Sequence, residues 1–312
     1  MPLLLCAIFL AQALPAQARP RDYNHLVIFS DPHLPGRLIP AKNKVVDTVN
    51  SWQDVDAVAV LGDITESAGT PQEYAFAKAF FARLRKPLYP IMGNHDYIYE
   101  IGPAGHPQKA PPAARQAHLK LFQDTFALPA ARYERRVGRY LCLFISIDDP
   151  DSQLVTGMSK ATLAWLEDEL RRNPKAPTLI FFHAPLAGTI QSRNGIVGND
   201  NYVAQPADKL RQLLIKNPQV FLWISGHAHL AATNARFADA KANLYEDRVT
   251  NIHNCDMNGH SYLSEQDLVR TTHDTIWTNS LFLYPDKVMI KTFDHKRHAW
   301  LGTLTRTIRP PR

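Results

Sequence analysis

The chain of 312 residues carries a formal net charge of +6, is 45% hydrophobic and 21% charged, and contains three cysteines and thirteen histidines. This composition excludes a disordered chain and a small disulfide framework, and the lack of an apolar stretch of about 18 residues excludes a transmembrane helix. Lys and Arg never occur in runs longer than two, so the positive charge gives no strong nucleic-acid signal. The histidines stand out, because histidine is the commonest metal ligand.

The first 18 residues have the pattern of a secretory signal peptide. An apolar run from Leu3 to Leu14 precedes Ala16-Gln17-Ala18, which has the small-x-small pattern of a cleavage site. No Lys or Arg precedes the run, so a buried N-terminal helix or strand is the alternative. Cleavage would leave Cys142 and Cys255, and we expect no bridge between them because Cys142 lies in an apolar run typical of a core strand. We therefore expect a secreted or periplasmic protein with a single domain over residues 19–312.

Strand and helix patterns alternate along the first two thirds of the chain. Short apolar runs predict buried strands over residues 26–29, 55–61, 87–92, 140–147, 178–182 and 220–225. Helices are predicted over residues 41–52, 71–85, 113–126, 159–172 and 206–216, with Thr70 and Ser159 as N-cap residues. From about residue 250 the chain becomes β-rich, with predicted strands over residues 275–284, 287–293 and 299–308. The pattern as a whole predicts an α/β fold around one core.

Five short polar motifs follow the predicted strands. They are Asp31-x-His33, Gly62-Asp63, Gly93-Asn94-His95-Asp96, His183-x-Pro185 and Gly226-His227-x-His229. Intervals of 32 and 31 residues separate Asp31, Asp63 and Asn94, and each interval fits one strand–helix–strand unit. Parallel strands would therefore deliver these three side chains to one edge of a sheet, which is where α/β proteins build their sites.

The motifs supply a set of metal-binding side chains. These are Asp31, His33, Asp63, Asn94, His183, His227 and His229. One divalent ion needs about four to six donors, so seven residues indicate two ions that share a carboxylate and a hydroxide. Oxygen and imidazole donors without thiolate suit Fe, Mn, Zn, Ni or Co. Such a pair of ions generates a nucleophilic hydroxide and stabilises both ends of an in-line displacement at phosphorus.

In this order, the five motifs resemble those of the calcineurin-like metallophosphoesterase superfamily, over about residues 26–229. The resemblance implies a four-layer αββα sandwich of two mixed β-sheets flanked by helices. It also implies one metal held by Asp31, His33, Asp63 and His229, and a second held by Asp63, Asn94, His183 and His227. His95 would protonate the leaving oxygen or bind a phosphate oxygen, and Asp96 would orient its ring. Glu66 stands where the family often has Asp or Asn in a supporting role.

The remaining cues concern the branch of the superfamily. Glu66 stands where purple acid phosphatases have a tyrosine ligand, and the chain lacks the arginines of Ser/Thr protein phosphatases. Gly93-Asn94-His95-Asp96, Thr70-Pro71-x-Glu73-Tyr74 and Leu163-x-Trp165-Leu166-Glu167 are similar to the class III cyclic-nucleotide-phosphodiesterase-like branch. We therefore predict a hydrolase for small phosphate mono- or diesters, with a phosphodiesterase favoured. The alternatives are a broad-specificity phosphomonoesterase of the acid, alkaline or protein phosphatase type, a nuclease, and a non-catalytic scaffold.

Two polar segments have open interpretations. Residues 188–202, which include Arg193, form a candidate lid because the segment is polar and glycine-rich and directly follows the His183 motif. Residues 253–260 are expected to be a polar loop between strands, and a substrate-side lip or an additional metal site is the alternative. The remaining histidines outside the motifs and these segments are expected on the surface or in the core: His25, His106, His118, His273, His295 and His298.

Overall fold

The computed structural model of the chain describes residues 21–190, 198–263 and 270–311. The predicted signal peptide over residues 1–18 lies outside these ranges, as does Arg193. Within the described ranges, no helix combines the length and apolar character that crossing a membrane requires. Cys142 and Cys255 are both buried and free, so the expectation that they form no bridge is confirmed.

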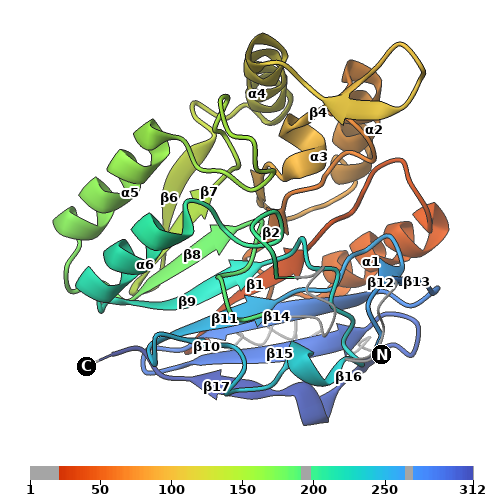
Figure 1. Cartoon of the computed structure of the whole chain (residues 1–312). Coiled ribbons are helices and arrows are strands. Elements are labelled where there is room, and N and C mark those ends of the chain that lie inside the picture. Colours follow the sequence, from red (N-terminus) through yellow and green to blue (C-terminus); the bar gives the residue numbers. More distant parts are fainter. Residues whose placement is uncertain (1–20, 191–197, 264–269, 312) are drawn as a thin grey trace, which may run out of the picture.

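Two β-sheets form the centre of the molecule (Figure 1). The first sheet is built from β1 (Asn24–Phe29), β2 (Ala57–Leu61), β3 (Leu88–Ile91), β14 (Trp277–Leu283), β15 (Val288–Asp294), β16 (Ala299–Trp300) and β17 (Arg306–Ile308). The second is built from β6 (Arg132–Val137), β7 (Tyr140–Ile145), β8 (Thr178–Phe182), β9 (Val220–Ser225), β10 (Leu244–Tyr245) and β11 (Val249–His253). Their orders are β16-β15-β14-β1-β2-β3, with β17 beside β15, and β10-β11-β9-β8-β7-β6.

Both sheets are mixed, with a parallel centre. Strands β1, β2 and β3 pair in parallel, and so do β7, β8, β9 and β11. Strand β14 runs antiparallel to β1, and β6 runs antiparallel to β7. Parallel neighbours end at the same edge of a sheet, so the segments that follow β1, β2 and β3 lie together, as do those that follow β8 and β9.

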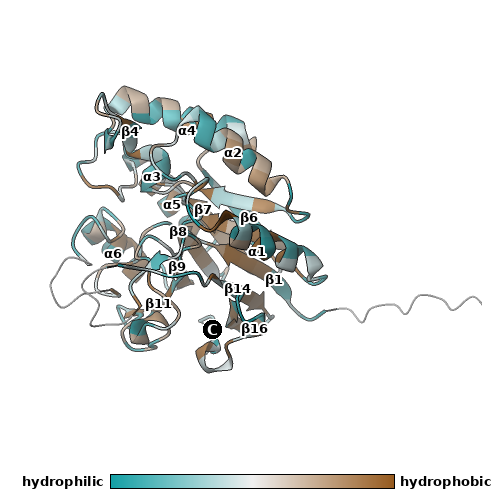
Figure 2. Cartoon of the chain, turned by 90° about the vertical axis from the view of Figure 1, so that its right-hand side faces the viewer, coloured by the Kyte–Doolittle hydropathy of each residue, from teal (hydrophilic) through white to brown (hydrophobic). Residues whose placement is uncertain are grey.

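Helices cover the outer faces of the two sheets (Figure 1). They are α1 (Ile39–Ser51), α2 (Pro71–Phe81), the short α3 (Asn94–Tyr97), α4 (Pro112–Phe126), α5 (Lys160–Arg172) and α6 (Ala207–Lys216), with 3₁₀ turns η1 (Ala235–Phe237) and η2 (Gly302–Leu304). Helices α1, α2 and α4 lie on the side of the first sheet, and α5 and α6 on the side of the second. The expected four-layer αββα sandwich is confirmed, and Figure 2 shows its apolar residues concentrated on the strands.

Alternate residues along a strand pack into different apolar clusters. Leu26 and Ile28 of β1 belong to the apolar cluster between the sheets, together with Phe144 of β7. Val27 and Phe29, which point the other way, belong to the cluster that includes the helices. Burial of such side chains contributes about 1.5–3 kcal/mol each, so this alternation fixes the register of the strands that deliver the site.

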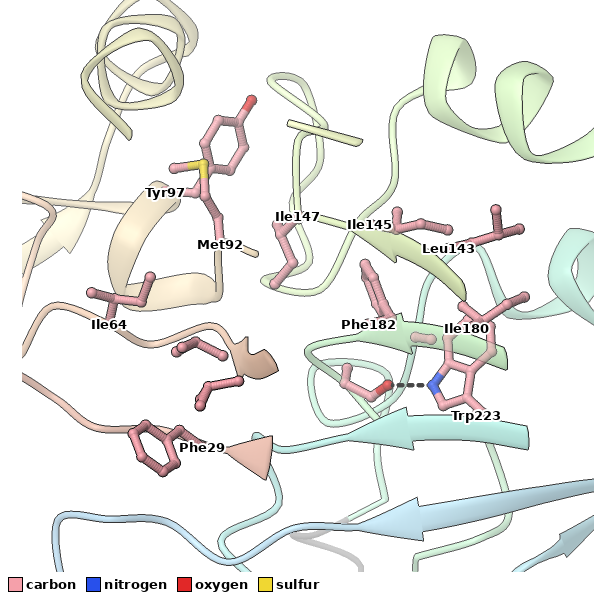
Figure 3. Packing of buried hydrophobic residues seen from close by; sticks show 14 of the residues in the cluster. Phe29, Ile64, Met92, Tyr97, Leu143, Ile145, Ile147, Ile180, Phe182 and Trp223 are labelled. Atoms are coloured by element: carbon pink, nitrogen blue, oxygen red, sulfur yellow. Dashed lines mark hydrogen bonds between the residues drawn. The ribbon is translucent and has the colours of Figure 1, made fainter. Parts of the chain in front are cut away.

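The outer cluster continues around the ends of the strands. Figure 3 shows Met92, Tyr97 and Ile147 between the apolar residues of the first sheet and those of the second. In the same view the indole Nε1 of Trp223 donates to the carbonyl of Ala184, at 2.9 Å. Ala184 directly follows His183, so a buried tryptophan fixes the backbone beside a predicted ligand.

The helix starts agree with the sequence, whereas part of the β-structure does not. Thr70 caps α2, and its hydroxyl forms a capping box with Glu73, while Ser159 caps α5. The single strand predicted over residues 299–308 is wrong, because the 3₁₀ turn η2 separates β16 from β17. The hairpin of β4 (Tyr99–Ile101) and β5 (Pro107–Lys109), strand β6 and the short pair β12 (His260–Ser261) and β13 (Thr271–Thr272) were not predicted.

Candidate metal centre

The motif residues meet where the two sheets end. Asp31 and His33 follow β1, Asp63 follows β2, and Asn94 begins the helix after β3. From the second sheet, His183 follows β8, and His227 and His229 follow β9. The loops are hydrogen-bonded to one another: the N–H of His33 donates to Asp63 O, and the N–H of Gly226 donates to His183 O, both at 2.8 Å. The topology therefore brings the predicted ligands to one place.

Potential ligand atoms form two groups that share one carboxylate. Asp31, His33, Asp63 and His229 form the first group and Asp63, His183 and His227 the second, with the ligand atoms of each group within 4.8 Å of one another. The oxygens of Asp63 lie 3.8 Å from His33 Nε2 and 3.4 Å from His183 Nε2. Asn94 joins the second group, because its Oδ1 lies 3.0 Å from His183 Nε2.

Backbone carbonyls fix which nitrogen each imidazole presents to the site. Nδ1 of His183 lies 2.6 Å from Leu61 O, and Nδ1 of His229 lies 3.0 Å from His260 O. Nε2 of His227 lies 2.9 Å from Asn201 O. A carbonyl only accepts, so each of these nitrogens carries the proton and the other ring nitrogen presents its lone pair.

When each ring carries only that one proton, lone pairs face lone pairs. His183 Nε2 faces the oxygens of Asp63 and Asn94, and His229 Nε2 lies 3.4 Å from Asp31 Oδ1. The buried His33 Nε2 has no hydrogen-bond partner among the described residues. Buried acceptors without donors are costly unless a cation lies between them, so the donor set fits a metal.

The ligand-bearing loops adopt unusual backbone conformations. Five predicted ligands have positive φ angles: Asp31 (48°), His33 (42°), Asp63 (47°), His227 (60°) and His229 (47°). A left-handed conformation costs a non-glycine residue about 1–3 kcal/mol and persists where the surroundings enforce it, typically at functional sites. Close packing also demands glycine: a Cβ on Gly93 would lie 2.3 Å from Asp63 Oδ1, and one on Gly226 would lie 2.3 Å from Asp31 Oδ2.

The protonation states favour metal ligation by most of the imidazoles. Burial lowers the pKa of His33 well below its usual value, that of His227 to about 3 and that of His229 to about 4, so these rings are neutral at pH 7. Burial also acts to lower the pKa of His183, but the carboxylates of Asp63 and Asp31 outweigh it and raise the pKa to about 9. Burial raises the pKa of Asp31 to about 7. A cation in the centre would replace the protons that these two groups hold.

Residues 25–231 match the family described as calcineurin-like phosphoesterase, which is about two thirds of the chain. The chain belongs to this family. It is 30% identical over 179 residues to a probable glycerophosphodiester phosphodiesterase of Arcobacter nitrofigilis, covering 57% of this chain and 58% of that protein. It is 25% identical over 177 residues to a 3′,5′-cyclic-nucleotide phosphodiesterase of Nostoc, covering 56% of each. The chain thus spans less than two thirds of the length of these relatives.

Solved structures support the fold. A dimetal phosphatase from Danio rerio superposes with a TM-score of 0.58 at 13% identity, covering 92% of this chain and 99% of that one. A purple acid phosphatase from yellow lupin superposes with a TM-score of 0.63 at 16% identity, covering 96% of this chain and 55% of that one. These similarities show that the chain shares the fold of these two phosphatases.

The predicted role of Asp96 beside His95 is wrong. The carboxylate of Asp96 accepts hydrogen bonds from the N–H groups of Ile64, Thr65 and Gly93, at 3.0, 2.9 and 2.8 Å. Consecutive residues of a helix do not face the same way, so α3 directs Asp96 inward while His95 lines the cavity beside the metal centre. Asp96 therefore ties together the loops that carry Asp63 and Asn94.

Glu66 has a similar supporting contact. Its Oε2 accepts from the N–H of Gly36 at 3.1 Å, which joins the loop after Asp63 to the loop after His33. None of the described histidines outside the motifs belongs to either ligand group; Nδ1 of His25, for example, lies 3.1 Å from Asp54.

Sequence reasoning missed how residues 253–260 support the centre. The N–H of Met257 donates to Ser30 O at 3.0 Å, and the buried Asp256 has Oδ2 at 3.7 Å from His229 Nδ1. Asn258 Oδ1 accepts from Nζ of Lys42 at 2.9 Å, and the same Nζ lies 3.4 Å from the carbonyl of His33. Lys42 is fully buried in α1, and this burial lowers its pKa to about 7. The segment therefore supports the ligand loops from behind.

The predicted lid segment is only partly described. Asn201 bonds His227 as stated above, and the ring centroid of Tyr202 lies 5.4 Å from that of His227. Residues 191–197 lie outside the described ranges, so the lid remains a prediction.

A cavity of about 340 Å³ opens beside the centre and is lined in part by Asp63, Asn94, His95, His227 and His229. Its volume suits a small ligand. A larger cavity of about 460 Å³ lies near Tyr23 and Tyr284 and contains none of the motif residues.

Proposed function

We propose that this chain is a metal-dependent phosphoesterase that hydrolyses small phosphate esters, with phosphodiesters favoured, at a centre of two divalent cations. The observation that carries the proposal is the position of Asp63, whose carboxylate belongs to both groups of potential ligands. The phosphodiesterases among the relatives support the preference for diesters.

The donor set indicates which residues would hold the cations. Asp31, His33, Asp63 and His229 would hold one cation, and Asp63, Asn94, His183 and His227 the other. When bound, the pair supplies Lewis-acid activation of the phosphate and of the attacking water. Iron, manganese and zinc all suit these ligands.

The protein itself fixes the ligand geometry before any cation binds. The backbone N–H of His95 donates to Asp63 Oδ1 at 2.8 Å, and that of His227 donates to Asp31 Oδ1 at 3.1 Å. These bonds orient both carboxylates from outside the centre. Because these carboxylates are already held in place, they lose little conformational entropy when the cations bind.

His95 is the candidate general acid. Its ring lines the cavity with its centroid 4.8 Å from that of His33, and its Nδ1 has no hydrogen-bond partner among the described residues. A ring that stands beside the centre without belonging to either ligand group can give a proton to the leaving oxygen of the ester.

The test is turnover of bis-p-nitrophenyl phosphate and p-nitrophenyl phosphate by the metal-stripped protein, before and after addition of Mn²⁺. We expect hydrolysis that depends on the cation and a higher rate with the diester. A faster monoester reaction would instead favour a phosphomonoesterase. A folded, Mn²⁺-loaded protein that hydrolyses neither compound would contradict the proposal.

A further inference from the structure

The cavity beside the centre contains two basic side chains that neither hold the cations nor transfer the proton. These are Lys109 and Arg270. The reacting phosphate would lie against the cations, so its charge needs neither of these side chains. Additional positive charge in a cleft of this size suits a ligand that carries a second anionic group.

Lys109 reaches the cavity through the hairpin that follows α3. In this hairpin Lys109 pairs directly with Tyr99, and directly opposed residues present their side chains on the same face. Both residues line the cavity. The N–H of Ala110 donates to Ile98 O at 2.8 Å and closes the base of the hairpin.

The ammonium of Lys109 is held in place but not saturated. Its Nζ donates to the carbonyl of Gln153 at 2.6 Å, and Val155 of the same loop also lines the cavity. An ammonium group has three donors, so two N–H groups have no partner among the described residues and are available to a ligand.

The hairpin lies on the side of the proposed general acid. The ring centroid of Tyr99 lies 5.4 Å from that of His95. In an in-line displacement, the leaving group departs next to the residue that protonates it. The carbon skeleton of the leaving group would therefore lie against Tyr99, within reach of Lys109.

We propose that Tyr99 and Lys109 form a leaving-group subsite that favours phosphate esters with a carboxylate or a second phosphate on the leaving group. This inference rests on the proposed function, because the position of the leaving group is defined by the role of His95. Arg270, the other basic residue of the cavity, provides an internal comparison.

The experiment measures binding and does not require turnover. Calorimetry on the Mn²⁺-loaded protein compares 4-carboxybenzylphosphonate with 4-carbamoylbenzylphosphonate, two compounds of the same shape that differ in one charge. We expect the carboxylate compound to bind about fivefold more tightly, which is the scale of a partly exposed charge pair.

Variants of Lys109 separate charge from structure. Lys109→Gln keeps a donor for Gln153 and should reduce the affinity ratio to one, whereas Lys109→Arg should retain it. Lys175→Gln, a change in an exposed loop, is the matched control and should also retain it. A wild-type ratio of one, or a ratio lost in Arg270→Gln but kept in Lys109→Gln, would overturn the subsite.

Turnover of bis-p-nitrophenyl phosphate and of p-nitrophenyl phosphate by the same Mn²⁺-loaded protein tests the proposed function separately. A protein that shows the affinity ratio without any turnover would support the subsite and contradict the enzymatic proposal. A protein that hydrolyses either ester but binds the two phosphonates equally would support the enzymatic proposal and contradict the subsite.

Discussion

Nδ1 of His229 lies 3.7 Å from Oδ2 of Asp256, a fully buried carboxylate that belongs to none of the five motifs. Asp256 in turn accepts hydrogen bonds from the backbone N–H groups of Asn258 and His260, at 3.0 and 3.1 Å, and from the hydroxyl of Ser261. The same Nδ1 also faces the carbonyl of His260. The carbonyl holds the tautomer of the imidazole, and the negative charge behind the ring makes it a stronger ligand.

Asp256→Asn should therefore weaken metal binding. The neutral amide keeps the shape of the side chain but loses the charge behind His229, and losses of this kind are about 10-fold to 100-fold in affinity. Competition with a chelating dye for Mn²⁺ measures the change. Asp294→Asn is the matched control, because Asp294 is also buried but bonds Trp277 instead of a predicted ligand. Equal affinities in the two variants would contradict the role of Asp256.

The shared carboxylate predicts a larger effect. Asp63→Asn removes the charge that both ligand groups use, so we expect the loss of bound metal and a fall in turnover of at least about 100-fold. Metal content after gel filtration, measured beside turnover, checks this result. The control is Asp47→Asn, which removes an exposed carboxylate that pairs only with Arg83 among its described contacts. Full metal content in Asp63→Asn would exclude the shared-ligand arrangement.

His95→Ala should separate metal binding from catalysis. Metal content should remain as in the wild type, while turnover falls about 10²-fold to 10⁴-fold, the usual contribution of a general acid. The leaving group provides the control: phenyl phosphate needs a proton more than p-nitrophenyl phosphate does, so its hydrolysis should fall further. An equal loss with both esters would show that His95 binds phosphate instead of donating a proton.

The grouping of the candidate ligands was predictable from sequence because their positions depend on a simple topology. Asp31, Asp63 and Asn94 each follow a strand of a parallel sheet, and the spacing of the strand–helix–strand units brings them to one edge. His183 follows β8, whose bounds the apolar pattern gave without error. Motif position alone was therefore enough to predict that these side chains lie together.

The supporting residues could not be predicted in the same way. Asp256 reaches His229 only because β11 pairs with β9, and this pairing joins residues that no local pattern connects. Prolines at positions 103, 107, 111 and 112 disfavour regular strands, so the sequence did not predict the hairpin of β4 and β5 or the position of Lys109. Asp96 was predicted to orient the ring of His95, its neighbour in the sequence. In the structure, helix geometry directs its carboxylate to the N–H groups of Ile64 and Gly93 instead.

The capping box of α2 predicts a change in stability without a change in chemistry. Thr70 accepts from the N–H of Glu73, whose carboxylate accepts from the N–H of Ser67 in the loop that follows Asp63. Thr70→Ala should lower the free energy of unfolding by about 1 kcal/mol. Urea unfolding measures this change, and Gln72→Ala, on the exposed first turn of the same helix, is the control. An unfolding midpoint identical to that of the control would exclude the cap.

Metal affinity should fall as the pH is lowered, because binding must displace protons from the ligands. The pKa of His183 is raised to about 9 by the carboxylates of Asp63 and Asp31, which outweigh its burial, and burial raises the pKa of Asp31 to about 7. Between pH 9 and pH 7, cation binding displaces one proton, from His183, so the affinity should fall about tenfold for each unit by which the pH is lowered. Below pH 7, binding also displaces a proton from Asp31, and the affinity should fall more steeply. Titration of the metal-free protein with Mn²⁺ between pH 6 and pH 9 gives both slopes, and circular dichroism at each pH verifies that the protein stays folded. Affinity that does not change over this range would contradict ligation by either residue, because binding must displace the proton on Nε2 of His183 and the proton on the Asp31 carboxyl.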